Sequence, residues 1–308
     1  LNIYKNILQR IFDEDSTIIS PSNIENILAI IANLYKIKMY GLNESLELQT
    51  MAANLVIKYF NSTVEVFNIS SLWALSYISL TDNEALQWQI LYSGVCQEIL
   101  TNPKYRTEKK YVLASIRLIG NVLSGHDMMM DELLKCNVLD FLKYTINIKH
   151  PTIRRETLWC ISNITAGTKL QMGLVIDSDI FGLIIEAVHD EIKEIIHEAV
   201  ICISNMVHGC DIDMAVKLVR MNIFEPIIYC LVHIGDYKIV QSALESLEGI
   251  LKQGELIKTI NSNNPNPFTE CFIKSGGADS LENCQNHENT TVSNLSTAII
   301  EKYFQIDN

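Results

Sequence analysis

The sequence predicts an all-helical solenoid, and three observations agree on it. Six apolar segments can be overlaid in one register, and the overlay returns every 42 to 44 residues. Each segment has the Leu, Ile and Val spacing of a helix with one buried face. The chain holds only 13 Gly and 6 Pro, and prolines such as Pro103 and Pro151 fall between the predicted helices. A repeat of this length indicates units that bury their apolar faces against their neighbours.

The six segments follow one another along the chain. In order they are NILAIIANL, LWALSYISL, SIRLIGNVLSG, LWCISNITAG, VICISNMVHG and ALESLEGILKQG. Their shared register position is held by Asn33, Tyr77, Asn121, Asn163, Asn205 and Gly249. Asn is a poor helix former. Its return in four apolar helices therefore indicates a shared function beyond packing.

The fourth segment shows how one repeat is built. Ile153 to Gly167 is predicted to be one long helix, ended by a glycine that accepts a positive φ angle. Leu158, Ile161 and Ile164 are spaced three apart and are predicted to form its buried stripe. Two shorter helices are predicted in KLQMGLVIDSD and IFGLIIEAVH. Three helices per repeat is the armadillo arrangement; the two-helix HEAT arrangement is the alternative.

We expect one armadillo-repeat domain over residues 1–308, wound as a right-handed superhelix. It would hold about six or seven repeats, of which the first is degenerate and residues 276–304 form the terminal capping repeat. The segment from Thr259 to Cys271 is predicted to be a loop. The chain opens at Leu1, without a Met and in the middle of the pattern, so we expect a fragment or a processed form.

Composition narrows the possible partners. A net charge of −12 argues against a phosphate-backbone partner and favours basic ligands. The sequence has no signal peptide and no apolar run of membrane-spanning length. The 8 cysteines are scattered without a C-x-x-C pair, which favours a reducing compartment over a disulfide framework or a zinc ribbon. We therefore expect no nucleic acid, membrane, metal or cofactor.

The long helix of the fourth unit carries the residues of a peptide receptor. Trp159 and Asn163 are four residues apart and therefore share a helix face, with Glu156 on the same side. A ladder of Asn amides can pair with the backbone of an extended peptide. An indole face can hold a Lys or Arg stem, and carboxylates such as Glu156, Glu198 and Asp127 can meet its charge. This combination predicts a groove for basic peptides.

Several segments closely resemble consecutive armadillo repeats of the importin alpha (karyopherin alpha) family, the adaptors for classical nuclear localisation signals. They are LWALSYISLTDNEALQWQILYSGV, SIRLIGNVLSGHD, RRETLWCISNITAG and ALESLEGILKQGE. The tail GGADSLENCQNHENTTVSNLSTAIIEKYF resembles the family's last repeat. The resemblance covers residues 22–304 approximately and corresponds to the fourth to tenth repeats of the family.

The resemblance implies which positions bind peptide. With the residues argued above, the predicted set is Trp159, Asn163, Asn121, Asn205, Arg117, Ser162, Glu156, Glu198, Asp127, Trp73, Tyr77 and Asn33. Trp159 with Asn163 matches the seventh repeat in full. Tyr77 and Arg117 match replacements that, in the family, separate two peptide sites. Asn121, Asn163 and Asn205 would belong to the minor signal site.

The chain departs from the family pattern at two further positions. Ile201 stands where the eighth repeat has Trp, so the slot beside Trp159 loses an aromatic wall, and Ala29 replaces the Trp of the fourth repeat. The second and third repeats and the amino-terminal importin-beta-binding segment are missing from this sequence. We therefore expect the minor site to dominate.

The resemblance implies a non-enzymatic nuclear import adaptor that binds basic localisation signals in an extended form, mainly at a minor-type site. It implies residence in both cytoplasm and nucleus. The implied partners are cargo proteins with basic signals, importin beta through a segment not present in this chain, and a recycling exportin at the C-terminal repeats.

Two other function classes were weighed. An armadillo scaffold that has lost signal binding is favoured by Ala29 and Ile201 and opposed by the retained asparagines. An enzyme would need the cluster of His189, His197, Cys202, His208 and Cys210. Those spacings fit no usual metal site, and the chain lacks a catalytic triad motif or a phosphate-binding glycine motif. We expect no catalytic activity.

Overall fold

The computed structural model describes residues 20–37, 46–80, 83–260 and 265–304, together with residues 6, 9 and 10. Within these residues all regular structure is helical. The contacts divide the chain into two compact units, a first unit of Leu1–Cys160 and a second unit of Ile161–Asn308. Each unit is described by itself. A single continuous domain over residues 1–308 stays a prediction.

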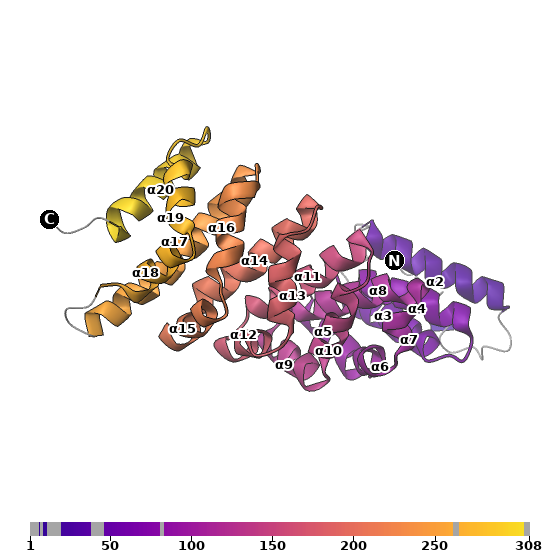
Figure 1. Cartoon of the computed structure of the whole chain (residues 1–308). Helices are drawn as coiled ribbons and strands as arrows, with labels where there is room; N and C mark the ends of the chain where they lie inside the picture. Colours follow the sequence, from indigo (N-terminus) through magenta and orange to yellow (C-terminus); the bar gives the residue numbers. More distant parts are fainter. Residues whose placement is uncertain are drawn as a thin grey trace. The chain divides into compact units, whose positions relative to one another are not determined.

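The first unit holds α2 to α10 and most of α11 (Figure 1). The bounds are α2 Pro21–Lys36, α3 Leu46–Phe60, α4 Glu65–Ile78, α5 Glu84–Tyr92, α6 Val95–Thr101, α7 Lys104–Thr107, α8 Lys109–Leu123, α9 Asp127–Lys135, α10 Val138–Ile146 and α11 Pro151–Thr165. The boundary between the units falls inside α11, after Cys160.

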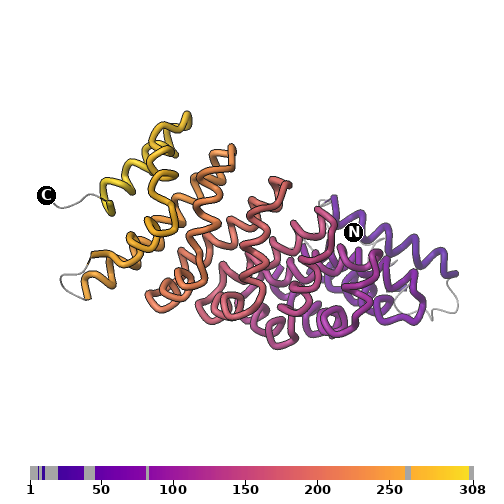
Figure 2. The backbone as a smooth tube through the Cα atoms, in the orientation of Figure 1, coloured from indigo at the N-terminus to yellow at the C-terminus, as the bar shows by residue number. Residues whose placement is uncertain are grey.

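The second unit holds the end of α11 and the helices after it, which can be followed along the tube in Figure 2. The bounds are α12 Lys169–Ile176, α13 Ile180–Val188, α14 Lys193–Gly209, α15 Ile212–Arg220, α16 Phe224–His233, α17 Tyr237–Ile260, α18 Pro267–Lys274, α19 Gly277–Cys284 and α20 Thr290–Tyr303. In the described part of the chain, no helix is both long and apolar enough to cross a membrane.

All six repeated segments lie on helices, as the register predicts. They fall on α2, α4, α8, α11, α14 and α17, which we call the long helices. Two short helices follow α11, and two more follow α14. One long and two short helices per repeat is the armadillo arrangement rather than the HEAT arrangement.

The buried stripe of the long helices confirms the predicted core. Leu158, Ile161 and Ile164 are all 0% exposed. Ile116 on α8 and Leu247 on α17 are equally buried. Because each fully buried Leu or Ile side chain contributes about 1.5–3 kcal/mol, these stripes are the main source of stability between neighbouring helices.

The turn between the two short helices of a repeat uses a left-handed residue in four repeats. The residues are Gly94, Asn137, Asn222 and Gly276, with φ between 61° and 86°. Glycine and asparagine adopt this conformation at the lowest cost. The periodic turn therefore explains why a Gly or Asn stands at this point of the repeat.

The end of α11 differs from its prediction. The helix stops at Thr165, close to Gly167, but Gly167 is not among the residues with positive φ, so the predicted mechanism is wrong. Thr168 instead starts α12 with a capping box, in which its hydroxyl accepts from the Gln171 N–H and the Gln171 side chain accepts from the Thr168 N–H. The start of the next helix therefore fixes this turn.

The predicted loop from Thr259 to Cys271 is wrong at both ends. Helix α17 continues to Ile260 and α18 begins at Pro267, while residues 261–264 lie outside the described residues. The Asn266 side chain accepts from the Phe268 N–H (3.0 Å) and donates to the Leu251 carbonyl (2.9 Å). An Asn cap before a proline is a helix start, and it fixes α18 against α17.

Candidate peptide-binding surface

Helices α4 and α8 pack together in the first unit and carry four of the predicted residues, Trp73, Tyr77, Arg117 and Asn121. On α4, Trp73 and Tyr77 stack with ring centroids 6.2 Å apart and planes at 28°. Both are half-buried. Because their rings are not sealed in the core, their faces are available to cationic side chains.

Arg117 on α8 occupies this aromatic surface. Its guanidinium carbon lies 5.9 Å from the Trp73 ring centre, and its Nη2 lies 3.3 Å from Glu156 Oε1. The Glu156 side chain is 11% exposed and also pairs with Arg155. An indole face and a carboxylate therefore hold one cation between them, as the sequence predicts for a ligand side chain.

A second cation of the chain lies beside the same surface. Lys36, at the end of α2, places its Nζ 5.7 Å from the centre of the Tyr77 ring. Asn33, one turn earlier on α2, is exposed, as is Ala29. In the described part of the chain the Asn33 side chain makes no hydrogen bond to the group around Trp73.

Asn121 has a structural role that the sequence did not reveal. It is 6% exposed, and its Nδ2 donates to the Ser76 carbonyl at 2.8 Å and to Ser79 Oγ at 2.9 Å. Both acceptors belong to the end of α4. The amide therefore braces α8 against the preceding repeat, and only its Oδ1 remains for another partner.

Trp159 rests on a glycine of α8. A Cβ atom built on Gly120 would lie 2.2 Å from the indole Cζ3 and 2.8 Å from Cys160 Sγ. Only a residue without a side chain admits this approach. Trp159 and Asn163, four residues later on α11, are both half-buried. A glycine directly before the register Asn was the signal that sequence reasoning missed.

In the second unit Asn205 braces α14 against the preceding long helix, as Asn121 braces α8, but with one hydrogen bond instead of two. Its Nδ2 donates to the carbonyl of Ser162 at 3.0 Å. Ser162 is 6% exposed, whereas Asn205 is half-buried. The side-chain oxygen and the second N–H of Asn205 have no hydrogen-bond partner among the described residues, so they remain available.

The remaining predicted residues are the two acids Glu198 and Asp127. Glu198 is half-buried on α14, three residues before the half-buried Ile201, and Asp127 is exposed as the first residue of α9. The first unit therefore brings together Trp73, Tyr77, Arg117 and Glu156. The second unit brings together Ser162 and Asn205.

In the cluster of His and Cys residues, Cys202 and Cys210 are buried, whereas His189, His197 and His208 are exposed. Among the described residues, no group of three or more His, Cys, Asp and Glu comes close enough to hold a metal ion. Cys202 is 0% exposed, and burial, with the Glu198 charge adding to it, raises the pKa of its thiol well above the usual range. The thiol is therefore protonated at neutral pH and is a poor nucleophile.

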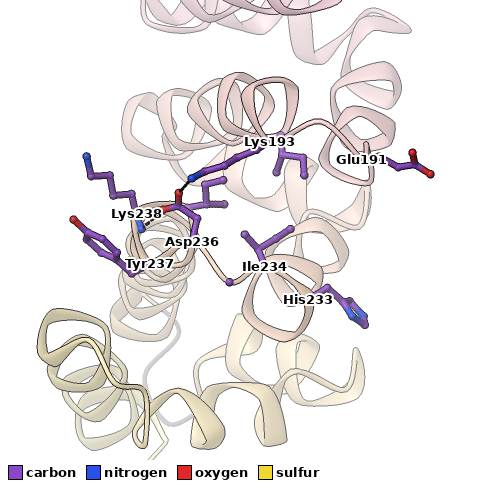
Figure 3. A pocket seen from close by; sticks show the side chains of 10 residues that line it. Glu191, Lys193, His233, Ile234, Asp236, Tyr237 and Lys238 are labelled. Carbon is purple, nitrogen blue, oxygen red and sulfur yellow. Dashed lines mark hydrogen bonds and ion pairs between the residues drawn. The ribbon is translucent and has the colours of Figure 1, made fainter. Parts of the chain in front are cut away.

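A separate pocket of about 710 Å³ lies in the second unit, where the turn before α14 faces the turn before α17 (Figure 3). Lys193 reaches Asp236 across it and forms an ion pair. Asp236 also accepts the Lys238 N–H at 2.8 Å. The bond from Lys193, followed by that from Lys238, lowers the pKa of Asp236. Of the two lysines that line this pocket, Lys193 is thus neutralised by Asp236, whereas the side chain of Lys238 is exposed.

Comparisons with known proteins agree with this architecture. A family profile described as an atypical Arm repeat matches residues 266–308. Importin subunit alpha-1b of Oryza sativa subsp. japonica is 36% identical over 236 residues, or 75% of this chain. Importin subunit alpha-3 of Arabidopsis thaliana is 37% identical over 242 residues, or 77% of this chain. This chain is an armadillo-repeat relative of importin alpha.

The relationship to importin alpha covers part of those proteins. The two alignments span 43% and 44% of the plant importin alpha subunits, so this chain spans less than half of their length. The predicted family resemblance is confirmed, and it extends over most of this chain.

Solved structures confirm the fold. A designed armadillo repeat protein in complex with the peptide (KR)4 has a TM-score of 0.66 at 19% identity, over 80% of this chain and 98% of that one. A further engineered protein has a TM-score of 0.68 at 16% identity, over 82% of this chain and 98% of that one. At these identities the likeness shows the armadillo fold alone.

Proposed function

We propose that this chain acts in a non-enzymatic nuclear import adaptor that binds basic localisation signals in an extended form. The observation that carries the proposal is the position of the Arg117 guanidinium. There the chain holds one of its own cations between the Trp73 ring and the Glu156 carboxylate. A surface that holds an arginine in this way has the chemistry to hold a lysine or arginine of a ligand.

The proposed ligand contacts are those of a minor-type site. Trp159 supplies an indole face for a cationic stem, and Asn163, one turn later, supplies an amide for the peptide backbone. Asn205 adds an oxygen and an N–H that have no partner among the described residues. Glu156 and Glu198 supply negative charge. Arg117 fills the slot of Trp73 and so marks the end of the site.

The relatives support the same assignment, because their names are those of importin alpha subunits. On this proposal the chain carries cargo with basic signals between cytoplasm and nucleus. Importin beta would be engaged through a segment that is not part of this sequence. A recycling exportin would contact the C-terminal repeats, α18 to α20.

The test is a fluorescence titration of a lysine-rich signal peptide. Trp159→Ala and Asn163→Ala are each expected to weaken binding by about 1–2 kcal/mol, or about 5- to 30-fold. Trp88→Ala on α5 and Asn294→Ala on α20 are matched controls outside the register and should bind like the unaltered chain. Because Trp159 also packs on Gly120, its variant is checked by thermal unfolding. Unchanged affinity in the Asn163 variant would refute the minor-site proposal.

Ile201→Trp tests the proposal in the opposite direction. The new indole would restore a second aromatic wall beside the site and is expected to tighten binding of the same peptide. The effect of one exposed cation–π contact is about 0.5–1 kcal/mol, or about two- to fivefold. No change would mean that the groove has been put to another use.

An armadillo scaffold that no longer binds signals is the second candidate function. It is favoured by Asn121, whose amide hydrogens bond to α4, and by the aliphatic Ile201. A pull-down with an immobilised basic signal peptide separates the two functions. Retention of the chain, and its release by competing free peptide, would exclude the scaffold.

A further inference from the structure

The first unit has a basic edge, and the proposed function does not use its Arg106, Lys109 and Lys149. Between Lys104 and Lys110 the sequence holds four basic residues and one acid, and between Lys143 and Arg155 it holds four basic residues and no acid. These stretches include the turns that lead into α8 and α11. In a chain of net charge −12 this is a local reversal of sign.

A pocket lies on this edge, between the end of α7 and the end of α10. It is about 620 Å³ in volume and is lined by Arg106, Asp140, Lys143, Tyr144, Asn147 and Ile148. The Arg106 guanidinium carbon lies 5.7 Å from the centre of the Tyr144 ring, which is 45% exposed. Asn147 donates to the Lys143 carbonyl at 2.8 Å and fixes the end of α10. The guanidinium therefore lies near an exposed ring, beside the fixed end of α10.

The pocket of the second unit gives a comparison. There Lys193 is neutralised by Asp236, and the exposed Lys238 lines the same pocket. Here Arg106 has no carboxylate within ion-pair distance among the described residues, although Asp140 lines the same pocket. Lys109, the first residue of α8, and Lys149, in the turn into α11, are exposed and likewise form no ion pair in the described part of the chain. Three cationic side chains of this edge therefore have no carboxylate partner among the described residues.

We propose that this pocket and its basic edge are a second binding site, for an acidic peptide segment whose carboxylates pair with Arg106, Lys109 and Lys149. The planar guanidinium matches a carboxylate in a two-point contact. Neighbouring helices stand about 8–10 Å apart, which is about two to three residues of an extended chain. On this proposal the carboxylates that pair with neighbouring helices are spaced two to three residues apart along one strand.

Carboxylate fits the site better than phosphate or nucleic acid. Asp140 lines the pocket, and its charge opposes a doubly charged phosphate more strongly than a singly charged carboxylate. The net charge of −12 repels a long polyanion, while a short acidic peptide meets mainly the local edge.

The test is fluorescence anisotropy of a labelled peptide with a run of glutamates, titrated with the full 308-residue chain at low salt. The glutamate peptide is expected to bind and to be released by added salt, whereas a glutamine peptide of equal length should not bind. Arg106→Gln should weaken binding roughly tenfold, since one charged hydrogen-bond donor pair is lost. Lys252→Gln, an exposed site on α17 with the same change in net charge, should leave it unchanged.

Two results would overturn the proposal. One is equal affinity of the Arg106 and Lys252 variants for the glutamate peptide. The other is tighter binding of a single-stranded DNA of matched charge, also sensitive to Arg106→Gln, which would make the edge a nucleic-acid site. The lysine-rich signal peptide should bind the Arg106 variant normally, which separates this site from the proposed groove.

Discussion

Helices α8 and α17 hold the same place in their repeats, one in each compact unit, yet they are fastened to the preceding long helix by different chemistry. In α8 the buried Asn121 donates two hydrogen bonds to the end of α4. In α17 that register position is Gly249, and a Cβ there would lie 2.5 Å from Val207 Cγ1. Gln253 instead donates to the Cys210 carbonyl at 3.2 Å.

The difference shows that the amide ladder serves two purposes. A repeat can be joined to its neighbour without the register Asn, since α17 uses a close backbone contact, Gln253 and the Lys193–Asp236 ion pair. At Asn121 and Asn205 the register Asn braces the neighbouring helix and leaves only part of its amide for a ligand, whereas Asn33 is exposed. Asn121 donates two bracing hydrogen bonds, and Asn205 donates one.

The largest effect is expected at the glycine contacts. Gly120→Ala would drive a methyl group into the indole of Trp159 and is expected to cost about 2–3 kcal/mol of stability. Gly249→Ala meets a single Val207 methyl and should cost about 1 kcal/mol or less, since alanine also favours the helix. Urea unfolding measures both. Gly182→Ala on α13, where a Cβ meets nothing within 4 Å, is the control and should stabilise the chain.

Similar losses for the Gly120 and Gly249 variants would remove the contrast between the two joints. The double variant Gly120→Ala with Trp159→Ala sharpens the result further. If the indole is the obstacle, the second substitution should recover part of the stability that the first one loses.

The two asparagines are expected to rank next. Asn121→Ala removes both bonds, leaves the buried Ser79 hydroxyl without a donor and leaves the Ser76 carbonyl with only the Ser79 hydroxyl at 3.2 Å, so it should cost about 1–3 kcal/mol. Asn205→Ala breaks one bond at a half-buried site and should cost about 0.5–1.5 kcal/mol. Urea midpoints of the two variants give the order. A larger loss at Asn205 would contradict the view that α8 is the more firmly braced helix.

Sequence alone was sufficient for the long helices, because the period of Leu, Ile and Val is a local signal. It also placed Trp159 and Asn163 on one helix face. It could not show that Asn121 bonds to Ser76 and Ser79, because the acceptors are more than 40 residues away and burial decides which partner an amide takes.

The remaining misses differ in kind. That Arg117 would fill the slot of Trp73 depends on the spacing of two neighbouring helices, which no single segment encodes. The start of α18, by contrast, had a local signal in Asn266 and Pro267 that was taken for a loop. Local signals of helix capping were thus available, whereas contacts between repeats were not.

The slot of Trp73 gives a pair of binding predictions of opposite sign. Arg117→Gln frees the indole and leaves Glu156 with less positive charge beside it, so a lysine-rich peptide should bind about two- to fivefold more tightly. Glu156→Gln leaves Arg117 and Arg155 facing the ligand and should weaken the same peptide. The titration used for the Trp159 variant measures both. Changes of equal sign would show that Arg117 and Glu156 act together on the ligand rather than in competition with it.

The smallest effect is expected at the start of α17, and it depends on pH. The hydrogen bond from Lys193 holds the pKa of Asp236 below its usual range, so the ionised carboxylate stabilises the fold. That contribution is present above the unfolded-state pKa of about 3.9 and is lost as the pH falls through the lower folded-state pKa.

Asp236→Asn keeps a side chain that can cap α17 but removes the charge. The variant should therefore unfold at a lower urea concentration at pH 7, with a gap that closes below about pH 4 as the carboxylate is protonated. Asp279→Asn, an exposed aspartate of α19 that forms no ion pair among the described residues, is the control. A gap at Asp236 that persists in acid would show that the cap geometry, and not the ion pair with Lys193, fastens α17 in place of the missing asparagine.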